Sequence, residues 1–229
     1  MDSITSFTKL NLGAGKKAAP RSEGWLNLDK FEYPTTDEFE YRKMDLFRYP
    51  WDLPDNSVDE VFASHIIEHI PHEAKRSSFP GHDEGEHIGE AEWYEKYWDV
   101  NRKWNKRWDE LKDLDGFFAF FAEIWRVCQP DALVNIVCPF GYTRGAFQDP
   151  THTRYIVPPT FYYLTAEENG NWDYHLPLKF KIIHCDLVFE PLALAQIHGM
   201  EQGDKDWIAS HEWDVFRDLT AQLQVVKEH

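Results

Sequence analysis

Hydrophobic residues along the chain form short apolar runs separated by amphipathic segments. The runs are flanked by turn or charged residues, which is typical of β-strands. They span residues 8–12, 25–29, 58–64, 133–139, 181–189 and 222–227. The clearest helical pattern spans residues 117–127, where apolar side chains fall on one face: Phe117, Phe120, Phe121, Ile124 and Val127. Strands that alternate with helices predict an α/β domain, with a mainly parallel sheet and helices on both faces.

The segment 73–115 interrupts this alternation, because it is dense in charges of both signs and contains a turn-rich stretch at residues 77–90. From Glu92 onward, apolar residues recur at steps of three and four, which predicts one stripe of an amphipathic helix. The stripe consists of Trp93, Tyr97, Val100, Trp104, Trp108 and Leu111. This helix either packs its rings onto the body or forms a lid that binds a substrate. We therefore expect a single domain over residues 1–229, with a Trp-rich helical insertion at 73–115.

A chain of 229 residues with 42% hydrophobic side chains is long enough for one buried core. Its apolar runs, such as residues 132–140, fall short of the roughly 20 residues that a membrane span needs. Residues 1–9 show no apolar signal segment. The three cysteines lie far apart at apolar positions, which favours reduced thiols over disulfides. These features predict a cytoplasmic protein without membrane contact.

The formal charge of −16 disfavours nucleic-acid partners, because phosphate backbones bind mainly to Lys and Arg. Aromatic residues make up 16% of the chain and include ten Trp. These rings either fill the core or form surface for a small-molecule or glycan substrate or for a second chain. The Trp-rich insertion is accordingly a candidate homodimer surface.

Two glycines follow the first predicted strand, in the sequence Gly13-Ala14-Gly15. Glycines at this position let the backbone turn sharply and approach a ligand, although ordinary turns also use them. Asp29 ends the next predicted strand, where a carboxylate can accept hydrogen bonds from both hydroxyls of a ribose. The dinucleotide-binding pattern would require a glycine at the position of Ala18. An adenosine ligand without a pyrophosphate is therefore favoured.

The stretch from Lys43 to His72 makes the chain similar to a known family. It resembles the class I S-adenosylmethionine-dependent methyltransferases, in particular the small type 11 group. The matching pieces are residues 11–15 (NLGAG), 24–29 (GWLNLD), 45–46 (DL), 53–54 (LP), 57–59 (SVD), 68–69 (EH) and 121–130 (FAEIWRVCQP). The resemblance covers residues 9–140. It implies a Rossmann-like sandwich with a mainly parallel seven-stranded sheet, S-adenosylmethionine as cofactor, and methyl transfer to an acceptor.

The resemblance also implies roles for individual residues. The glycine loop, formed by Asn11, Gly13, Ala14 and Gly15, would bind the cofactor, with Gly13 and Gly15 against its methionine part. Asp29 would hold the ribose, Asp45 and Leu46 would meet the adenine, and Ser64 and His65 would lie near the sulfonium. Two departures affect the methionine end: the loop is shortened to residues 16–23, and Asn11 replaces an acidic residue often found there.

Residues 65–69 also spell His-x-x-Glu-His, the pattern of inverted zinc peptidases. On a helix, His65 and His69 would lie one turn apart and could share a zinc ion, with Glu68 as general base. The preceding strand places His65 at a strand-to-helix corner, which weakens this alternative. On the His-x-x-Glu-His pattern, a zinc-dependent hydrolase is nevertheless a second hypothesis. A fold that binds S-adenosylmethionine without turnover is a third.

A polar loop follows the predicted strand at 133–139 and contains Asp149, Thr151, His152, Arg154 and Tyr155. Related type 11 proteins carry a similar Asp-Pro-Thr-His stretch. His152 could take a proton from an acceptor hydroxyl, with Asp149 orienting its ring. His69 completes the set of candidate catalytic residues. The alternative is a turn closed by its own Asp and Thr hydrogen bonds. The acceptor is open among small molecules, sugars and peptides.

Overall fold

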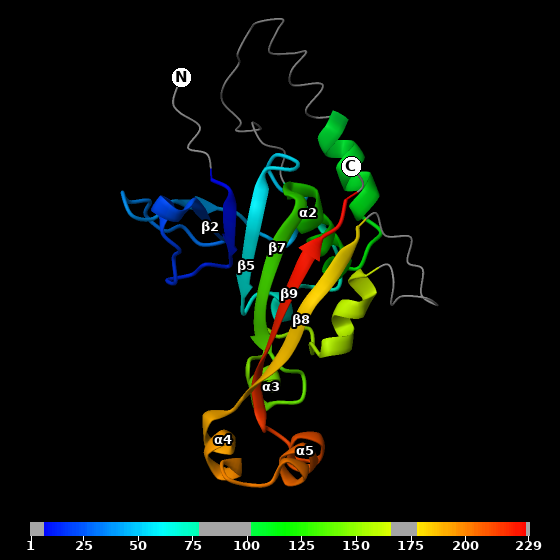
Figure 1. Ribbon diagram of the computed structural model, residues 1–229. Coiled ribbons are helices and arrows are strands. Elements are labelled where there is room, and N and C mark those ends of the chain that lie inside the picture. The colour runs from blue at the N-terminus through cyan, green and yellow to red at the C-terminus, as the bar shows by residue number, and fades with distance from the viewer. Residues whose placement is uncertain (1–6, 78–101, 166–177, 228–229) are drawn as a thin grey trace, which may run out of the picture.

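The protein is described by a computed structural model for residues 7–77, 102–165 and 178–227. Its centre is a seven-stranded sheet in the order β3-β2-β1-β5-β7-β9-β8 (Figure 1). Neighbouring strands are parallel, except that β9 runs antiparallel to β7 and β8. The strands are β1 (Lys9–Leu12), β2 (Trp25–Asp29), β3 (Tyr41–Lys43), β5 (Val58–Ser64), β7 (Cys128–Pro139), β8 (Phe180–Phe189) and β9 (Phe216–Val225). This arrangement confirms the predicted mainly parallel seven-stranded sheet.

Short elements and helices connect these strands. A two-stranded sheet pairs β4 (Arg48–Tyr49) with β6 (Lys75–Arg76). The α-helices are residues 102–111, α2 (Gly116–Val127), α3 (Arg144–Gln148), α4 (Pro191–Ile197) and α5 (Gln202–His211). The 3-10 helices are η1 (Arg21–Glu23), η2 (Ile67–His69) and η3 (Pro158–Leu164). The apolar pattern missed β3, α4 and α5, because β3 is a polar three-residue edge strand and α4 and α5 are mostly exposed.

Helix α2 supplies the main apolar layer against the sheet. Asp115 caps its first turn, because the carboxylate accepts a hydrogen bond of 2.8 Å from the Phe117 amide. The predicted face is buried, with Phe120, Phe121 and Ile124 excluded from solvent. These side chains pack on the strand side chains, and together they form one contiguous core.

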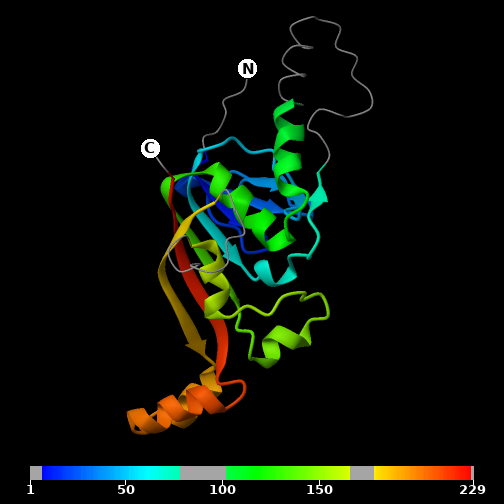
Figure 2. The same cartoon turned by 90° about the vertical axis from the view of Figure 1, so that its right-hand side faces the viewer.

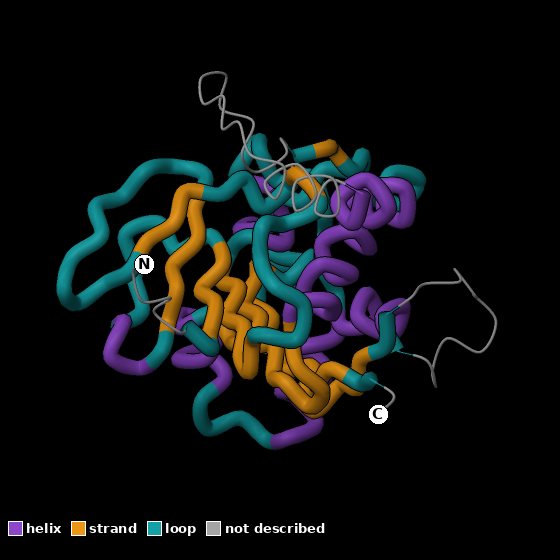
Figure 3. Tube along the Cα trace, turned by 90° about the horizontal axis from the view of Figure 1, so that it is seen from above, coloured by secondary structure: helices purple, strands orange, loops and turns teal. Residues whose placement is uncertain are grey.

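The helices cover the two faces of the sheet unequally. Figures 1 and 2 show the helix at 102–111, α2 and η3 on one side of the sheet. On the opposite side, η1 lies at the β1–β2 edge, and α4 and α5 lie beyond the ends of β8 and β9 (Figures 2 and 3). Burial alternates along β5, β7 and β9 accordingly. In the described part of the chain, the second helical layer is thus thinner than the first.

A row of polar side chains crosses the less covered face. Lys9 forms an ion pair of 3.0 Å with Glu60 and lies 5.3 Å from the ring centre of Trp25. Glu60 also accepts a hydrogen bond of 3.1 Å from Asn135, which in turn accepts one of 2.8 Å from Gln222. The row spans β2, β1, β5, β7 and β9. It satisfies the polar groups that the less covered face of the sheet presents to water.

The described part of the predicted insertion packs onto the body. Residues 102–111 are helical, and Trp104 and Leu111 are buried. Trp93, Tyr97 and Val100 lie outside the described residues. In the described part of the stripe, Trp104 and Leu111 are therefore packed against the body.

No helix in the described ranges has the length and apolarity needed to cross a bilayer. The thiols of Cys128, Cys138 and Cys185 are unpaired.

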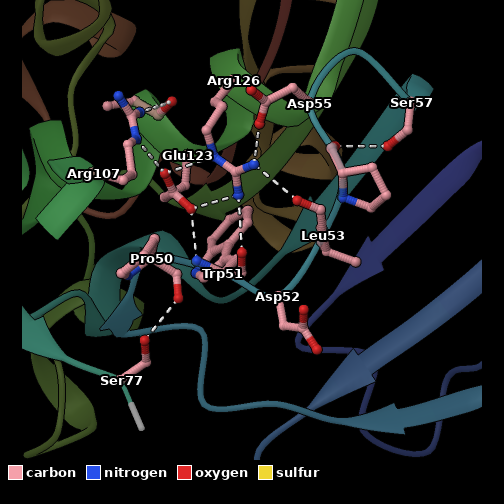
Figure 4. Close-up of polar contacts among 12 residues, drawn as sticks. Pro50, Trp51, Asp52, Leu53, Asp55, Ser57, Ser77, Arg107, Glu123 and Arg126 are labelled. Atoms are coloured by element: carbon pink, nitrogen blue, oxygen red, sulfur yellow. Dashed lines mark hydrogen bonds and ion pairs between the residues drawn. The ribbon is translucent and has the colours of Figure 1, made fainter. Parts of the chain in front are cut away.

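A buried ion-pair network ties α2 to the segment between β4 and β5 (Figure 4). The Glu123 carboxylate is inaccessible to solvent and accepts hydrogen bonds from Arg107 (2.9 Å), Arg126 (3.0 and 2.8 Å) and the Trp51 amide (2.6 Å). Arg126 also pairs with Asp55 and donates to the carbonyl oxygen of Trp51 at 3.0 Å. Every polar group of Glu123 is thereby satisfied inside the core.

Replacing Glu123 by Gln should destabilise the fold by about 3–5 kcal/mol, because two buried guanidinium groups lose their shared counter-charge. Equilibrium denaturation measures this loss. Glu110→Gln is the matched control, since Glu110 pairs with the same Arg107 from a 42% exposed position. That change should cost less than about 1 kcal/mol. Equal losses in both variants would contradict the assigned role of the network.

Candidate functional site

A cavity of about 590 Å³ opens at the carboxyl ends of β1, β2 and β5. This volume lies within the range of about 300–1,000 Å³ that is typical of small-molecule sites. The chain adds β2 and β3 on one side of β1 and then crosses to β5 on the other side. Such a reversal leaves a crevice between the two strand ends, where open α/β sheets bind ligands. The cavity is lined by Gly13, Gly15, Asp29, Lys30, Phe31, Tyr33, Met44, Asp45, Leu46, Phe47, Arg48, His65, Ile66, His69, Pro71, Lys75 and Thr151.

The glycine loop needs its glycines for two different reasons. Gly13 and Gly15 adopt φ values of +66° and +52°, a region that other residues rarely occupy. A Cβ atom on Gly13 would stand 2.9 Å from Ile66 Cδ1 and 3.3 Å from Ile66 Cβ. On Gly15 a Cβ atom would meet no atom within 4 Å. Gly13 is therefore required for packing as well as for conformation.

Two asparagines hold the shortened loop that follows. Asn11 donates to the Lys17 carbonyl oxygen at 3.0 Å and to Asn27 Oδ1 at 2.9 Å. Asn27 in turn bonds to both the amide and the carbonyl of Ala19. The loop leads into the three-residue turn η1 and not into an α-helix. A helix N-terminus that would receive a pyrophosphate does not follow this loop, which agrees with a ligand lacking one.

Asp29 lies at the end of β2 with 8% of its surface exposed. Its Oδ2 accepts a hydrogen bond of 2.8 Å from the Gly15 amide, and its Oδ1 accepts one of 2.9 Å from the Phe31 amide. A carboxylate has about four acceptor positions, so each oxygen can accept a further bond. The carboxylate is thus fixed by backbone groups and still able to bind a diol from the cavity.

The segment 44–48 forms another wall of the cavity. Asp45 pairs with Arg48 at 3.1 Å and accepts a bond of 3.1 Å from the Phe47 amide. The carbonyl oxygen of Leu46 accepts a bond of 3.1 Å from the indole of Trp51. Because Trp51 is held by Glu123, the buried ion-pair network positions this wall.

Several residues differ from their expected place. Asn11 and Ala14 support the glycine loop from behind, and Ser64 is paired with Val137 in the sheet; none of the three lines the cavity. The lining residues that the sequence analysis missed follow Asp29, flank Asp45 or lie near His65 and His69, with one more from β6. They are Lys30, Phe31, Tyr33, Met44, Phe47, Arg48, Ile66, Pro71 and Lys75. Their position after a strand end was the available signal, but their residue types carry no motif.

Residues 65–69 do not form the helix that the inverted zinc-peptidase pattern requires. His65 has a φ of +53° at the corner after β5, and η2 contains only residues 67–69. The interaction with the Glu68 carboxylate raises the pKa of His65, and it outweighs the opposing effect of burial. Because residues 65–69 are not helical, His65 and His69 do not form the expected pair of ligands one helical turn apart.

His69 lies at the end of the cavity, beside Thr151. The Thr151 hydroxyl donates to Asp149 at 2.7 Å, so its oxygen can only accept from His69 Nδ1 at 3.0 Å. The Thr151 carbonyl oxygen, 3.3 Å from the same nitrogen, is also an acceptor. These contacts place the proton of neutral His69 on Nδ1 and leave a lone pair on Nε2. The two hydrogen bonds from Thr151 lower the pKa of Asp149.

His152 lies next to His69, with ring centres 4.7 Å apart and planes at 76°. Its Nδ1 is 3.0 Å from the Ala146 carbonyl oxygen, whereas its Nε2 is 4.0 Å from Asp149. The expectation that Asp149 orients His152 is therefore wrong: Ala146 orients that ring, and Asp149 acts on His69 through Thr151.

Two other residues of this loop do not reach the cavity. Arg154 donates to the carbonyl oxygens of Ile70 (2.7 Å) and Pro71 (2.8 Å), and it forms an ion pair of 2.7 Å with Asp115. Tyr155 is stacked on Phe147 with ring centres 4.4 Å apart. Arg154 is thus an anchor between the loop and η2, and Tyr155 belongs to an exposed aromatic pair.

Solved structures share this architecture. A S-adenosylmethionine-dependent methyltransferase from Archaeoglobus fulgidus is 15% identical, with a TM-score of 0.50 over 96% of this chain and 89% of its own. A chain from the complex between a methyltransferase and the Trm112 methyltransferase activator of Haloferax volcanii is 13% identical, with a TM-score of 0.52 over 100% of this chain and 86% of its own. No family model and no curated protein matches the chain. The likeness shows the Rossmann-like fold of class I methyltransferases.

The glycine geometry predicts unequal costs for two alanine substitutions. Gly15→Ala should destabilise the protein by about 1–2 kcal/mol, the cost of the left-handed conformation alone. Gly13→Ala should cost a further 1–3 kcal/mol or so, because the new methyl group overlaps Ile66. Denaturant unfolding of the two variants compares these values. If Gly15→Ala proved the more costly, the packing assigned to Gly13 would be refuted.

Proposed function

We propose that this protein is an S-adenosylmethionine-dependent methyltransferase that acts on a small-molecule, sugar or peptide acceptor. The observation that carries the proposal is the combination, in one cavity, of the glycine loop, the fixed Asp29 carboxylate and His69 at the far end. The shared fold supports the same activity.

The cavity suits the shape and charge of the cofactor. Gly15 presents no side chain to the cavity, so backbone atoms can approach the methionine part of the ligand. Asp29 can accept from both ribose hydroxyls while it keeps its two backbone hydrogen bonds. The adenine would then lie against the wall formed by Asp45 and Leu46. The short turn after the glycine loop favours this ligand over a dinucleotide.

Bound S-adenosylmethionine supplies an electrophilic methyl group on a positively charged sulfur. The protein's task is then to hold the acceptor in line with the C–S bond and to exclude water. Transfer would form a bond from the acceptor atom to the methyl carbon and would leave the C–S electron pair on sulfur. His69 Nε2 is placed to accept the proton that a hydroxyl or amine acceptor loses, and Asp149 supports the resulting charge through Thr151.

Replacing Asp29 by Asn should weaken binding of S-adenosylmethionine by about 10–100-fold, because hydrogen bonds from the ribose to a charged acceptor are lost. Calorimetric titration of the cofactor and of its demethylated product measures this effect. Asp59→Asn is the control, since Asp59 lies exposed on strand β5 and is not among the cavity lining residues. The affinity of this variant should match that of the unmodified protein. An unchanged affinity in Asp29→Asn would remove the ribose assignment.

Replacing His69 by Gln should lower methyl transfer by at least about 100-fold while cofactor affinity stays unchanged. The assay follows radiolabelled methyl groups from the cofactor into panels of small molecules, sugars and peptides. Thr151→Val, which removes the hydroxyl between His69 and Asp149, should give a smaller loss. Cofactor binding by the unmodified protein without transfer to any acceptor would favour a non-catalytic scaffold.

A further inference from the structure

Three side chains gather their ligand atoms in one place, and one of them, His69, lines the end of the cavity. Glu68, His69 and His152 each offer one oxygen or nitrogen, and these atoms all lie within 4.8 Å of one another. From this cluster we infer a site for one divalent transition-metal ion. The set differs from the peptidase pattern, because Glu68 is a ligand in it, His152 comes from the loop after α3, and His65 is absent.

The environment of the Glu68 carboxylate points to a bound cation. Only 2% of the residue is exposed, and neither carboxylate oxygen accepts a hydrogen bond from a described residue. His65 Nδ1 lies 3.5 Å from Oε1, longer than a well-formed charge-assisted hydrogen bond. Burial of a carboxylate without hydrogen bonds is strongly unfavourable. A metal ion bound between Glu68 and the two histidines supplies the missing partner.

Both imidazoles are oriented as metal ligands are. Metal-binding histidines commonly donate their second ring N–H to a carbonyl, carboxylate or similar acceptor, which fixes the tautomer and the ring plane. His152 Nδ1 faces the Ala146 carbonyl oxygen at 3.0 Å, and His69 Nδ1 faces Thr151. In both rings Nε2 is then the nitrogen that carries the free lone pair.

Backbone hydrogen bonds bring the two segments of the cluster together. The Glu68 carbonyl oxygen accepts from the amides of Thr153 (2.9 Å) and Arg154 (3.1 Å). The Thr153 hydroxyl and the Arg154 side chain both donate to the carbonyl oxygen of Ile70 at 2.7 Å. His152 is therefore held beside η2 independently of any bound ion. Metal–ligand bonds of about 2.0–2.2 Å place neighbouring donor atoms roughly 3.0–3.5 Å apart, so binding would contract the cluster slightly.

The donor set indicates the class of ion. Two imidazole nitrogens and one carboxylate oxygen suit Zn²⁺, Co²⁺, Fe²⁺ or Mn²⁺, whereas Mg²⁺ and Ca²⁺ prefer oxygen ligands. Three protein ligands leave at least one coordination position open, as in catalytic zinc sites. His69 lines the cavity, so an open position faces the acceptor end. A hydroxyl bound there would lose its proton to water more readily, and the ion would take over the task assigned to His69 Nε2.

The test uses the full chain, freed of metal by chelation and then titrated with Zn²⁺ and Co²⁺. Calorimetry should give one ion per chain, and Co²⁺ should produce the visible absorption of a low-symmetry site with nitrogen and oxygen ligands. Glu68→Gln and His152→Ala should each weaken metal binding at least tenfold. His198→Ala is the control, because His198 is exposed and follows α4, away from the cluster.

Cofactor affinity measured on the same variants separates this inference from the proposed methyltransferase activity, on which it does not depend. We expect Glu68→Gln and His152→Ala to bind S-adenosylmethionine as the unmodified protein does. Absence of a stoichiometric ion in the unmodified protein would overturn the metal site whatever the variants do. Equal metal affinity in His152→Ala and His198→Ala would overturn it as well. In a crystal soaked with Zn²⁺, an anomalous peak must lie between Glu68, His69 and His152.

Discussion

The reversal of strand order at β1 is the constraint on which the rest of the structure depends. The chain extends the sheet from β1 to β2 and β3, and then returns to add β5 on the other side. Because these strands are parallel, their carboxyl ends and the turns that follow meet at one edge. Gly13, Asp29 and His65 are far apart in sequence and meet there because each directly follows or ends a strand. The cavity is therefore a product of topology before any single side chain contributes to it.

The sheet is packed mainly from one side in the described part of the chain, which places unusual demands on the layer that does cover it. Helix α2 contributes a nearly continuous apolar surface, and its remaining charged residue inside the core, Glu123, is fully hydrogen-bonded. Those bonds reach Trp51 and, through its indole, the carbonyl of Leu46. A single buried carboxylate thus connects the main helix of the core to the wall of the cavity. On the less covered face, the polar row through Glu60 and Asn135 replaces packing with hydrogen bonds.

The sequence predicted the fold and the positions of the glycine loop and Asp29 better than the contacts within the polar loop at 149–155, for physical reasons. Strand periodicity and glycines with special backbone geometry are local signals, and Gly13, Gly15 and Asp29 lie where their motifs placed them. The orientation of His152 was mispredicted, because Ala146 provides a backbone carbonyl and carbonyls carry no sequence signature. Glu68 and His152 come together because hydrogen bonds join two segments that are about 85 positions apart in the sequence. Such pairing appears only after the chain is folded.

Glu68 and Glu123 show how the same chemical group takes two roles in one core. Both carboxylates are almost completely buried. Glu123 accepts hydrogen bonds from two arginines and a backbone amide, so its charge is neutralised and its effect is structural. Glu68 receives no hydrogen bond from the described residues, although its own backbone is firmly held. The same core therefore satisfies one buried carboxylate fully and leaves the other without a hydrogen bond next to the cavity residue His69. Glu68 lies 3.5 Å from His65 Nδ1 but accepts no hydrogen bond from the described residues, and two imidazole lone pairs lie beside it. This arrangement supports the metal ion proposed at that position.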